Sequence, residues 1–262
     1  MTIAAMELFG LKDRHVLITG AGGGIGRALV ATFQAAGARV SGADRDLSLL
    51  EGLDLVHRLT FDLTDPTSIT REMARLDEAD AMPDVLISNA GFTRADMLDQ
   101  VDTAAWNNEL AINLTGAFHV ATPVVAAMAR RGGGAIVFIA SVNALAHYGN
   151  PAYSAAKAGL IAYAKALAVE RGAVGIRANV ICPGSVRTPA WDHRFERQPG
   201  LAAQVLPHYP LGRLVVADEV ARAALFLASP AASGITGAVL PVDAGLTAGN
   251  YRFVKDVIEG SA

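Results

Sequence analysis

Cysteine and long apolar runs are scarce in this chain, and each scarcity excludes a class of protein. Cys182 is the one cysteine among 262 residues, so no disulfide can form within the chain, which is typical of a reducing compartment. We therefore expect a cytoplasmic location, with Cys182 as a small buried side chain in the apolar segment "NVICPG". The longest apolar segment, "AIVFIA" at 135–140, has the length of a strand, so we expect no membrane-spanning segment.

An excess of charge of one sign is also lacking. Charged residues make up 18% of the chain and leave a formal net charge of −3, which predicts no basic surface for nucleic acid or an anionic membrane. The six histidines are scattered without the spacing of metal ligands, so we expect no metal site. With 52% hydrophobic residues, the chain is long enough to bury about three quarters of its unfolded surface.

Short apolar segments alternate with longer, alanine-rich amphipathic ones. Strands are expected at 15–20, 38–44, within 55–65, and at 83–91, 134–141, 176–184 and 238–245. Helices are expected at 24–36, 104–130, about 153–170 and 218–229. Because the strands are apolar on both faces, the alternation predicts an α/β fold with one doubly wound, parallel seven-stranded sheet covered by helices on both faces. No repeat or linker interrupts it, so we predict a single domain over 1–262.

The segment 185–213 is the irregular part of the chain. Its prolines, aromatic residues and mixed charges interrupt the alternation directly after an expected strand. Loops beyond the carboxyl ends of strands bind ligands in open α/β sheets, so this segment is our candidate substrate lid.

The segment "LITGAGGGIG" follows the first expected strand and opens the first helix. Glycines at 20, 24 and 26 would let the backbone approach a pyrophosphate at the positive end of that helix, although a plain tight turn would also use them. Asp44 ends the second strand, where dinucleotide folds place a carboxylate on the adenosine ribose. That carboxylate favours NAD over NADP, although the adjacent Arg45 could hold the extra phosphate of NADP.

The segment "AYSAAKAGL" places Tyr153 and Lys157 four residues apart, which is one turn of a helix. A phenol and an ammonium at this distance can alter each other's protonation, but the spacing is also common by chance. The pair alone therefore leaves a structural role open.

Four features together resemble the short-chain dehydrogenase/reductase family: the glycine pattern, the Tyr153–Lys157 pair, Ser141 twelve residues before the tyrosine, and "CPGSVRT". They occur in the family's order, and the resemblance runs from about residue 10 to 247. It implies a Rossmann-type fold and hydride transfer between NAD(H) and a secondary alcohol or its carbonyl. It also implies a homotetramer, or a homodimer, with a small-molecule substrate.

The resemblance also implies roles for individual residues. Asn113, Ser141, Tyr153 and Lys157 match the family's catalytic residues. Tyr153 would be the general acid/base, its pKa lowered from about 10 by Lys157 and by the oxidised nicotinamide. Contacts to the cofactor are implied for Gly20, Gly24, Ile25, Gly26, Asp44, Arg45, Asp62, Leu63, Asn89, Ala90, Gly91, Tyr153, Lys157, Pro183, Gly184, Val186 and Thr188. Ser88 departs from the family's Asn-Asn-Ala-Gly motif, a change that we expect to be tolerated.

Substrate contacts are expected from Ser141, His147, Tyr148, Trp191 and His193. These polar side chains favour a sugar or polyol. The alternative within the family is a 3-oxoacyl thioester (acyl carrier protein) reductase, which would ordinarily use NADPH. A non-catalytic NAD(H)-binding regulator is the alternative from another class, but such relatives usually lack the tyrosine or the lysine. The tail 249–262 extends beyond the resemblance and could reach the active site of a neighbouring subunit.

Replacing Asp44 with alanine is expected to narrow the preference for NAD over NADP, because the carboxylate no longer repels the extra phosphate. We expect the ratio of the two kcat/KM values to fall about tenfold, which corresponds to about 1.4 kcal/mol. Steady-state kinetics with both cofactors measures this ratio. An unchanged ratio would assign the discrimination to Arg45 instead.

Overall fold

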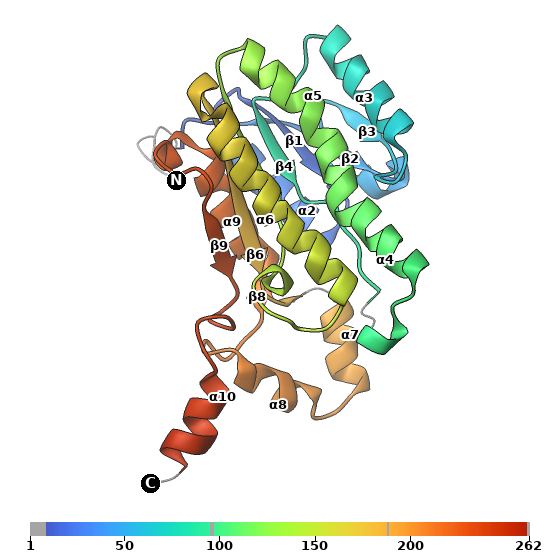
Figure 1. Ribbon diagram of the computed structural model, residues 1–262. Coiled ribbons are helices and arrows are strands. Elements are labelled where there is room, and N and C mark those ends of the chain that lie inside the picture. The colour runs from blue at the N-terminus through green and yellow to red at the C-terminus, as the bar shows by residue number, and fades with distance from the viewer. Residues whose placement is uncertain (1–8, 95–96, 188, 261–262) are drawn as a thin grey trace.

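The computed structural model describes residues 9–94, 97–187 and 189–260. A parallel sheet of seven strands forms its centre, in the order β3-β2-β1-β4-β5-β6-β9 (Figure 1). The strands are β1 (His15–Thr19), β2 (Arg39–Asp44), β3 (Arg58–Thr60), β4 (Val85–Ser88), β5 (Gly134–Ile139), β6 (Ile176–Pro183) and β9 (Val239–Val242). The strand order reverses between β1 and β4, which is where such sheets bind ligands. The predicted doubly wound fold is therefore confirmed.

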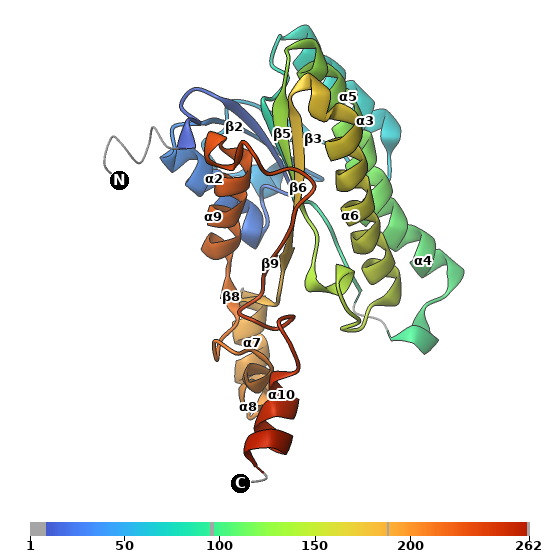
Figure 2. The same cartoon turned by 60° about the vertical axis from the view of Figure 1, so that its left-hand side comes forward.

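Helices cover both faces of the sheet (Figure 2). One face carries α2 (Gly24–Ala35) and α9 (Ala217–Ala228), which pack against each other. The opposite face carries α3 (Pro66–Glu78), α5 (Gly116–Arg130) and α6 (Pro151–Arg171). Each face has its own buried apolar cluster.

The central strand β1 shows why both faces are apolar. All of its residues are buried, and side chains alternate between the two clusters. Val16 and Ile18 face the α2 side together with Phe33, whereas Leu17 faces the α5 side with Phe138. Because helices cover both faces, the strand reads as a continuous apolar run. Cys182, in β6, is fully buried, as predicted.

The long helix expected at 104–130 is divided into α4 (Thr103–Leu110), the π-helical turn η3 (Ala111–Thr115) and α5. By length and composition, Thr103–Arg130 is apolar enough to be a candidate membrane span, which the sequence analysis did not foresee. The core helix of a folded domain meets the same criterion. Here α5 buries Val120, Ala121 and Val124 in the cluster beside the sheet.

The candidate lid is more regular than expected. It contains α7 (Pro189–Arg197), α8 (Leu201–Val205) and the short strand β7 (Val186–Arg187), which pairs with β8 (Val215–Val216). These elements lie beyond the sheet at one end of the molecule, and the helix α10 (Tyr251–Phe253) and the turn η8 (Val254–Glu259) project from the same end (Figures 1 and 2). Short amphipathic helices with prolines at their borders produce the mixed pattern that the sequence shows.

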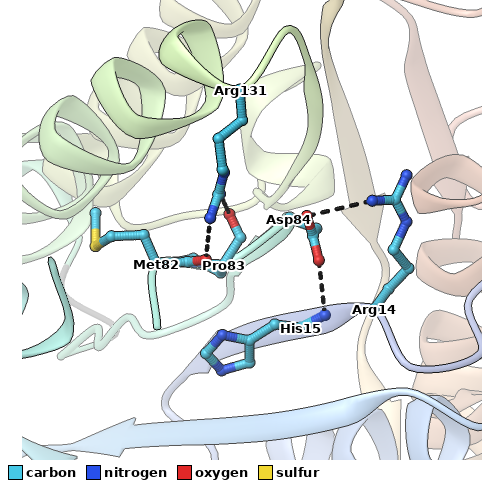
Figure 3. A network of polar contacts seen from close by, with 6 residues as sticks. All are labelled: Arg14, His15, Met82, Pro83, Asp84 and Arg131. Atoms are coloured by element: carbon cyan, nitrogen blue, oxygen red, sulfur yellow. Dashed lines mark hydrogen bonds and ion pairs between the residues drawn. The ribbon is translucent and has the colours of Figure 1, made fainter. Parts of the chain in front are cut away.

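At the amino-terminal edge of the sheet, polar contacts join β1 to the start of β4 (Figure 3). The Asp84 carboxylate accepts hydrogen bonds from the His15 backbone N–H (2.9 Å) and from the Arg14 guanidinium (3.3 Å). Arg131 donates two hydrogen bonds of 2.6 Å to the carbonyl groups of the two residues before Asp84. These contacts stabilise the amino-terminal ends of the strands, whereas the predicted site residues lie at the carboxyl-terminal ends.

His15 is buried at this edge, with its Nε2 2.7 Å from the Ser41 hydroxyl. Burial, reinforced by the charges of His57 and Arg39, lowers the pKa of His15 from 6.5 to about 4. The unfolded chain therefore takes up this proton first as the pH falls. His15 should thus lower the free energy of unfolding between about pH 6.5 and pH 4, and leave it unaffected above that window.

We predict that His15→Gln reduces the loss of stability between pH 7 and pH 4.5, by an amount of up to about 3 kcal/mol. Denaturant unfolding of both proteins at the two pH values measures this difference. Carboxylates also titrate in this pH range, but they change the free energy of unfolding of both proteins. The difference between variant and wild type therefore reports on His15. Equal losses in the two proteins would contradict the prediction.

Candidate active site

The glycine loop connects β1 to α2 at the carboxyl edge of the sheet. Gly20 has a φ of 64°, and a Cβ there would lie 2.9 Å from the Cα of Ala90, so the position accepts only glycine. A Cβ on Gly26 would clash with the Gly20 carbonyl group. Gly24 and Ile25 begin α2, whose first backbone N–H groups lack helical partners. This close-packed turn at a helix N-terminus fits a pyrophosphate group.

Asp44 lies beside this loop. Its Oδ2 accepts a hydrogen bond from the Gly22 N–H (3.0 Å), and its Oδ1 accepts one from the Arg45 N–H (2.8 Å). Each carboxylate oxygen has a second lone pair that remains for a ribose hydroxyl. The Arg45 side chain is exposed next to it. The chain's own residues therefore fit the adenosine end of a dinucleotide.

Two further predicted cofactor contacts, Asp62 and Leu63, follow β3. The Asp62 carboxylate accepts hydrogen bonds from the Thr64 N–H (2.8 Å) and hydroxyl (2.7 Å), and these bonds lower its pKa. Leu63 packs against Gly116, where a Cβ would lie 2.6 Å from the Cβ of Leu63. This contact places the residues after β3 against the start of α5.

The segment after β4 is tied to the end of β1. The Asn89 amide donates to the carbonyl groups of Thr19 (3.0 Å) and Gly20 (3.2 Å). The Thr19 hydroxyl accepts from the N–H groups of both Asn89 and Ala90 at 3.0 Å. Thr19 was not predicted to be part of the site. Its hydroxyl links the end of β1 to the segment after β4, at the point where the strand order reverses.

Asn113 occupies the π-helical turn η3 and is 1% exposed. Its Oδ1 accepts from the Phe92 N–H (3.0 Å), and its Nδ2 donates to the Phe92 carbonyl group (2.7 Å). A Cβ on Gly91 would lie 2.8 Å from this Oδ1 and 3.1 Å from the Lys157 Nζ. The structure thus brings Gly91, Asn113 and Lys157 together.

The helix α6 brings Tyr153 and Lys157 to the same place. It approaches η3 closely because Gly159 has no Cβ, which would lie 2.7 Å from a methyl group of Leu114. Lys157 is 2% exposed, and its Nζ donates to the Ile139 carbonyl group at the end of β5 (3.0 Å). The same Nζ lies 5.5 Å from the centroid of the Tyr153 ring.

Ser141 begins the turn after β5. Its Oγ lies 3.2 Å from both the backbone nitrogen and the Oδ1 of Asn143. The Asn143 amide in turn donates to the Gly149 carbonyl group (2.9 Å) and to the Ser154 hydroxyl (3.2 Å). Asn143, which the sequence analysis missed, therefore holds the loop that joins Ser141 to the tyrosine helix.

Burial shifts the two titratable side chains of this site in opposite directions. It raises the pKa of Tyr153 to about 12, against the effect of a hydrogen bond with Ser141. It lowers the pKa of Lys157 to about 8. In the chain alone, the pKa of Tyr153 is therefore raised rather than lowered as expected, because desolvation of the buried phenol is the largest effect on it.

The predicted residues after β6 border the same edge. Pro183 ends β6, and a Cβ on Gly184 would lie 3.0 Å from the Cα of Asp243. Val186 lies in β7. Thr188, the last of this group, lies outside the described residues.

The predicted substrate residues do not all come together. A cavity of about 620 Å³ lies between the loop before α6, the end of the lid and the tail. Its polar lining residues are Tyr148, His208, Thr247, Asn250, Tyr251 and Arg252. Tyr148 was predicted. His208 and the tail residues were not, because no local pattern shows that the tail returns to this loop.

The other predicted substrate residues do not line this cavity. His147 is exposed in the loop before α6. His193 on α7 is 77% exposed and lies 3.5 Å from Glu196. Trp191 packs against Phe195.

Comparison with known proteins identifies the family. A family model described as enoyl-(acyl carrier protein) reductase matches residues 20–247, a range that includes every predicted catalytic residue. The chain belongs to the short-chain dehydrogenase/reductase family. This dehydrogenase/reductase is therefore an oxidoreductase of a family that binds a nicotinamide cofactor.

The relatives of this chain include two that are named for different substrates. An uncharacterized oxidoreductase of Schizosaccharomyces pombe is 41% identical over 249 residues, covering 94% of this chain and 96% of the relative. The 3-oxoacyl-[acyl-carrier-protein] reductase of Escherichia coli is 37% identical, covering 90% and 98%. Galactitol 2-dehydrogenase (L-tagatose-forming) of Cereibacter sphaeroides is 36% identical, covering 92% and 97%.

A solved structure supports the same assignment. An oxidoreductase of this family from Burkholderia thailandensis superposes with a TM-score of 0.86 at 45% identity. The match covers 96% of this chain and 99% of that structure.

We predict that Gly91→Ala lowers kcat for an alcohol substrate at least tenfold, because the added Cβ displaces the Asn113 amide and the Lys157 ammonium. Gly172→Ala is the matched control, since an ideal Cβ there meets no atom of the described residues within 4 Å. Steady-state kinetics of both variants, with thermal unfolding to verify folding, measures the effect. Equal rates in the two variants would contradict it.

Proposed function

We propose that this dehydrogenase/reductase interconverts a secondary alcohol and its carbonyl compound, with NAD(H) as cofactor and Tyr153 as the group that transfers the proton. The convergence of Ser141, Tyr153, Lys157 and Asn113 beside the glycine loop supports this function best. When bound, the nicotinamide supplies a hydride acceptor or donor. The remaining chemistry belongs to the side chains of the chain.

Tyr153 exchanges the proton at its Oη. With a pKa of about 12, the phenol is protonated at neutral pH and can donate to a carbonyl oxygen during reduction. During oxidation the phenol must first lose its proton, so we expect this direction to accelerate as the pH rises. Ser141, whose hydroxyl is close enough to the phenol to affect its pKa, would hold the substrate oxygen beside it.

Asp44 supports NAD as the cofactor. Its carboxylate is held beside the glycine loop by two backbone N–H groups, so it cannot easily turn away from an incoming phosphate. Arg45 is exposed next to it. Its positive charge is the feature that would favour NADP instead. We propose NAD because the Asp44 carboxylate, held in place by these two hydrogen bonds, would repel the extra phosphate of NADP.

We also propose a sugar or polyol as the substrate. Since none of the four catalytic side chains lines the cavity beside the tail, this cavity would bind the part of the substrate away from the reacting carbon. Its lining combines hydroxyl groups, an amide, an imidazole and a guanidinium, which together can bind several hydroxyl groups. The relationship to a galactitol 2-dehydrogenase favours the same class. The oxidative direction would then yield the corresponding keto sugar.

A 3-oxoacyl thioester reductase is the second candidate. It is favoured by the relationship to the Escherichia coli 3-oxoacyl-[acyl-carrier-protein] reductase. Exposed apolar side chains near the site, such as Leu145 and Phe92, could contact an acyl chain. Asp44 disfavours this candidate, because such reductases ordinarily use NADPH.

The first experiment is a substrate panel. Formation of NADH from NAD, or of NADPH from NADP, is followed at alkaline pH with sugars, polyols, cyclic alcohols and 3-hydroxyacyl thioesters. Turnover of a sugar or polyol with NAD is expected, whereas turnover of the thioesters with NADP would establish the second candidate. NADH binding without any turnover would favour a regulatory protein.

Tyr153→Phe is predicted to lower kcat by about 10²–10⁴-fold, because the variant has no hydroxyl to exchange the proton. The affinity for NADH should change by less than about threefold, since the ring and its packing remain. Steady-state kinetics and fluorescence titration with NADH measure the two quantities. A large loss of NADH affinity would assign Tyr153 to cofactor binding instead.

A further inference from the structure

The helix α4 carries a buried carboxylate that none of the roles above includes. Glu109 is only 5% exposed. Its Oε1 accepts a hydrogen bond from the Arg94 backbone N–H (3.0 Å), and its Oε2 accepts one from the Asn113 Nδ2 (2.9 Å). Glu109 thus joins the segment after β4 to the π-helical turn that carries Asn113.

A carboxylate is required for this pair of contacts. Both partners are N–H donors, and they approach different oxygen atoms of the same side chain. Glutamine has a single acceptor oxygen, so one of the two donors would face its NH₂ group. An apolar residue would leave the Arg94 N–H without this acceptor, which is destabilising. It would also remove one of three acceptors of the Asn113 Nδ2, which donates to the carbonyl groups of Phe92 and of residue 109 as well.

Glu109 also lies close to the proton-transferring side chain. It lines a small cavity together with Tyr153, Asn150 and Ala152, and this cavity has room for about one water molecule. Buried charges interact strongly because little solvent separates them. A negative charge at Glu109 therefore acts on Tyr153 and Lys157, the two titratable groups that α6 places in the site.

We propose that Glu109 is a positioning residue, which holds Asn113 and the segment after β4 in place and keeps a negative charge beside Tyr153 and Lys157. The inference rests on the function proposed above for Tyr153. The charge stabilises the phenol over the phenolate and the ammonium over the amine. Glu109 thereby favours the protonated form of both groups, the state that reduces a carbonyl.

Among the residues that the structure describes, few other charged and titratable groups act on this site. The helix α6 contributes Tyr153 and Lys157, and β6 contributes the buried Cys182, whose pKa burial raises to about 11. Arg94 contacts the carboxylate through its backbone N–H. In accord with the proposal, the charge of Glu109 adds to the effect of burial in raising the pKa of Tyr153, and it opposes burial in the case of Lys157.

Titration of Lys157 tests the proposal without any substrate. In protein labelled with carbon-13 lysine, the NMR signal of Lys157, assigned with Lys157→Arg, should have its midpoint about one pH unit lower in Glu109→Gln than in wild type. Lys165 lies on the same helix and is exposed, so its midpoint serves as the internal control. An unchanged Lys157 midpoint in folded Glu109→Gln would overturn the proposal.

The pH dependence of turnover gives the second readout. In Glu109→Gln, the rise of kcat/KM for alcohol oxidation with pH should move about one unit to lower pH. Glu109→Asp retains the charge but shortens the reach to Asn113, so it should lower kcat about tenfold without moving the profile. Glu170→Gln, an exposed position at the far end of α6, should match wild type in both.

The outcomes separate the two proposals. A lower rate at every pH with no shift in Glu109→Gln would reduce Glu109 to a structural residue and leave the role of Tyr153 intact. A wild-type protein without turnover on the whole panel would remove the proposed function. The lysine titration would still decide whether Glu109 carries the charge that acts on α6.

Discussion

A lysine ammonium buried at the carboxyl edge of a parallel sheet is the constraint on which the rest of this site depends. Lys157 has lost nearly all contact with solvent, so its charge must be compensated within the protein. The Ile139 carbonyl group accepts a hydrogen bond from the ammonium, and the negative charge of Glu109 favours its protonated form. Gly91 leaves the space that its Nζ needs. Residues from three separate parts of the chain thus accommodate and stabilise one buried ammonium group.

The same burial disfavours the ionised form of Tyr153, which the oxidation proposed above would require. Desolvation disfavours both the phenolate of Tyr153 and the ammonium of Lys157, and it leaves the phenol with a pKa far above neutral. The positive ring of an oxidised nicotinamide would favour the phenolate. The two directions of the reaction would therefore place opposite demands on one buried phenol, and Glu109 shifts the balance toward its protonated form.

The fold divides structural and functional contacts between the two edges of its sheet. At the amino-terminal edge, Asp84 and Arg131 satisfy backbone groups and close the structure (Figure 3). At the carboxyl end of the sheet, glycines occupy positions where a side chain would clash, so the backbone remains accessible beyond the neighbouring strands β1 and β4. The tail and the lid extend beyond this second edge and shape the cavity there.

Structural features that depend on residues close together in the sequence could be predicted from the sequence alone. The apolar strands predicted the parallel sheet, and the glycine loop, Asp44 and the Tyr153–Lys157 spacing predicted where the site lies. These features depend on local periodicity, which any helix or strand imposes. Only the tertiary structure showed that burial raises the pKa of Tyr153, that Glu109 lies inside the site and that the tail lines the cavity. Solvent exposure and contacts between distant segments arise when elements pack, and residue spacing in the sequence does not contain them.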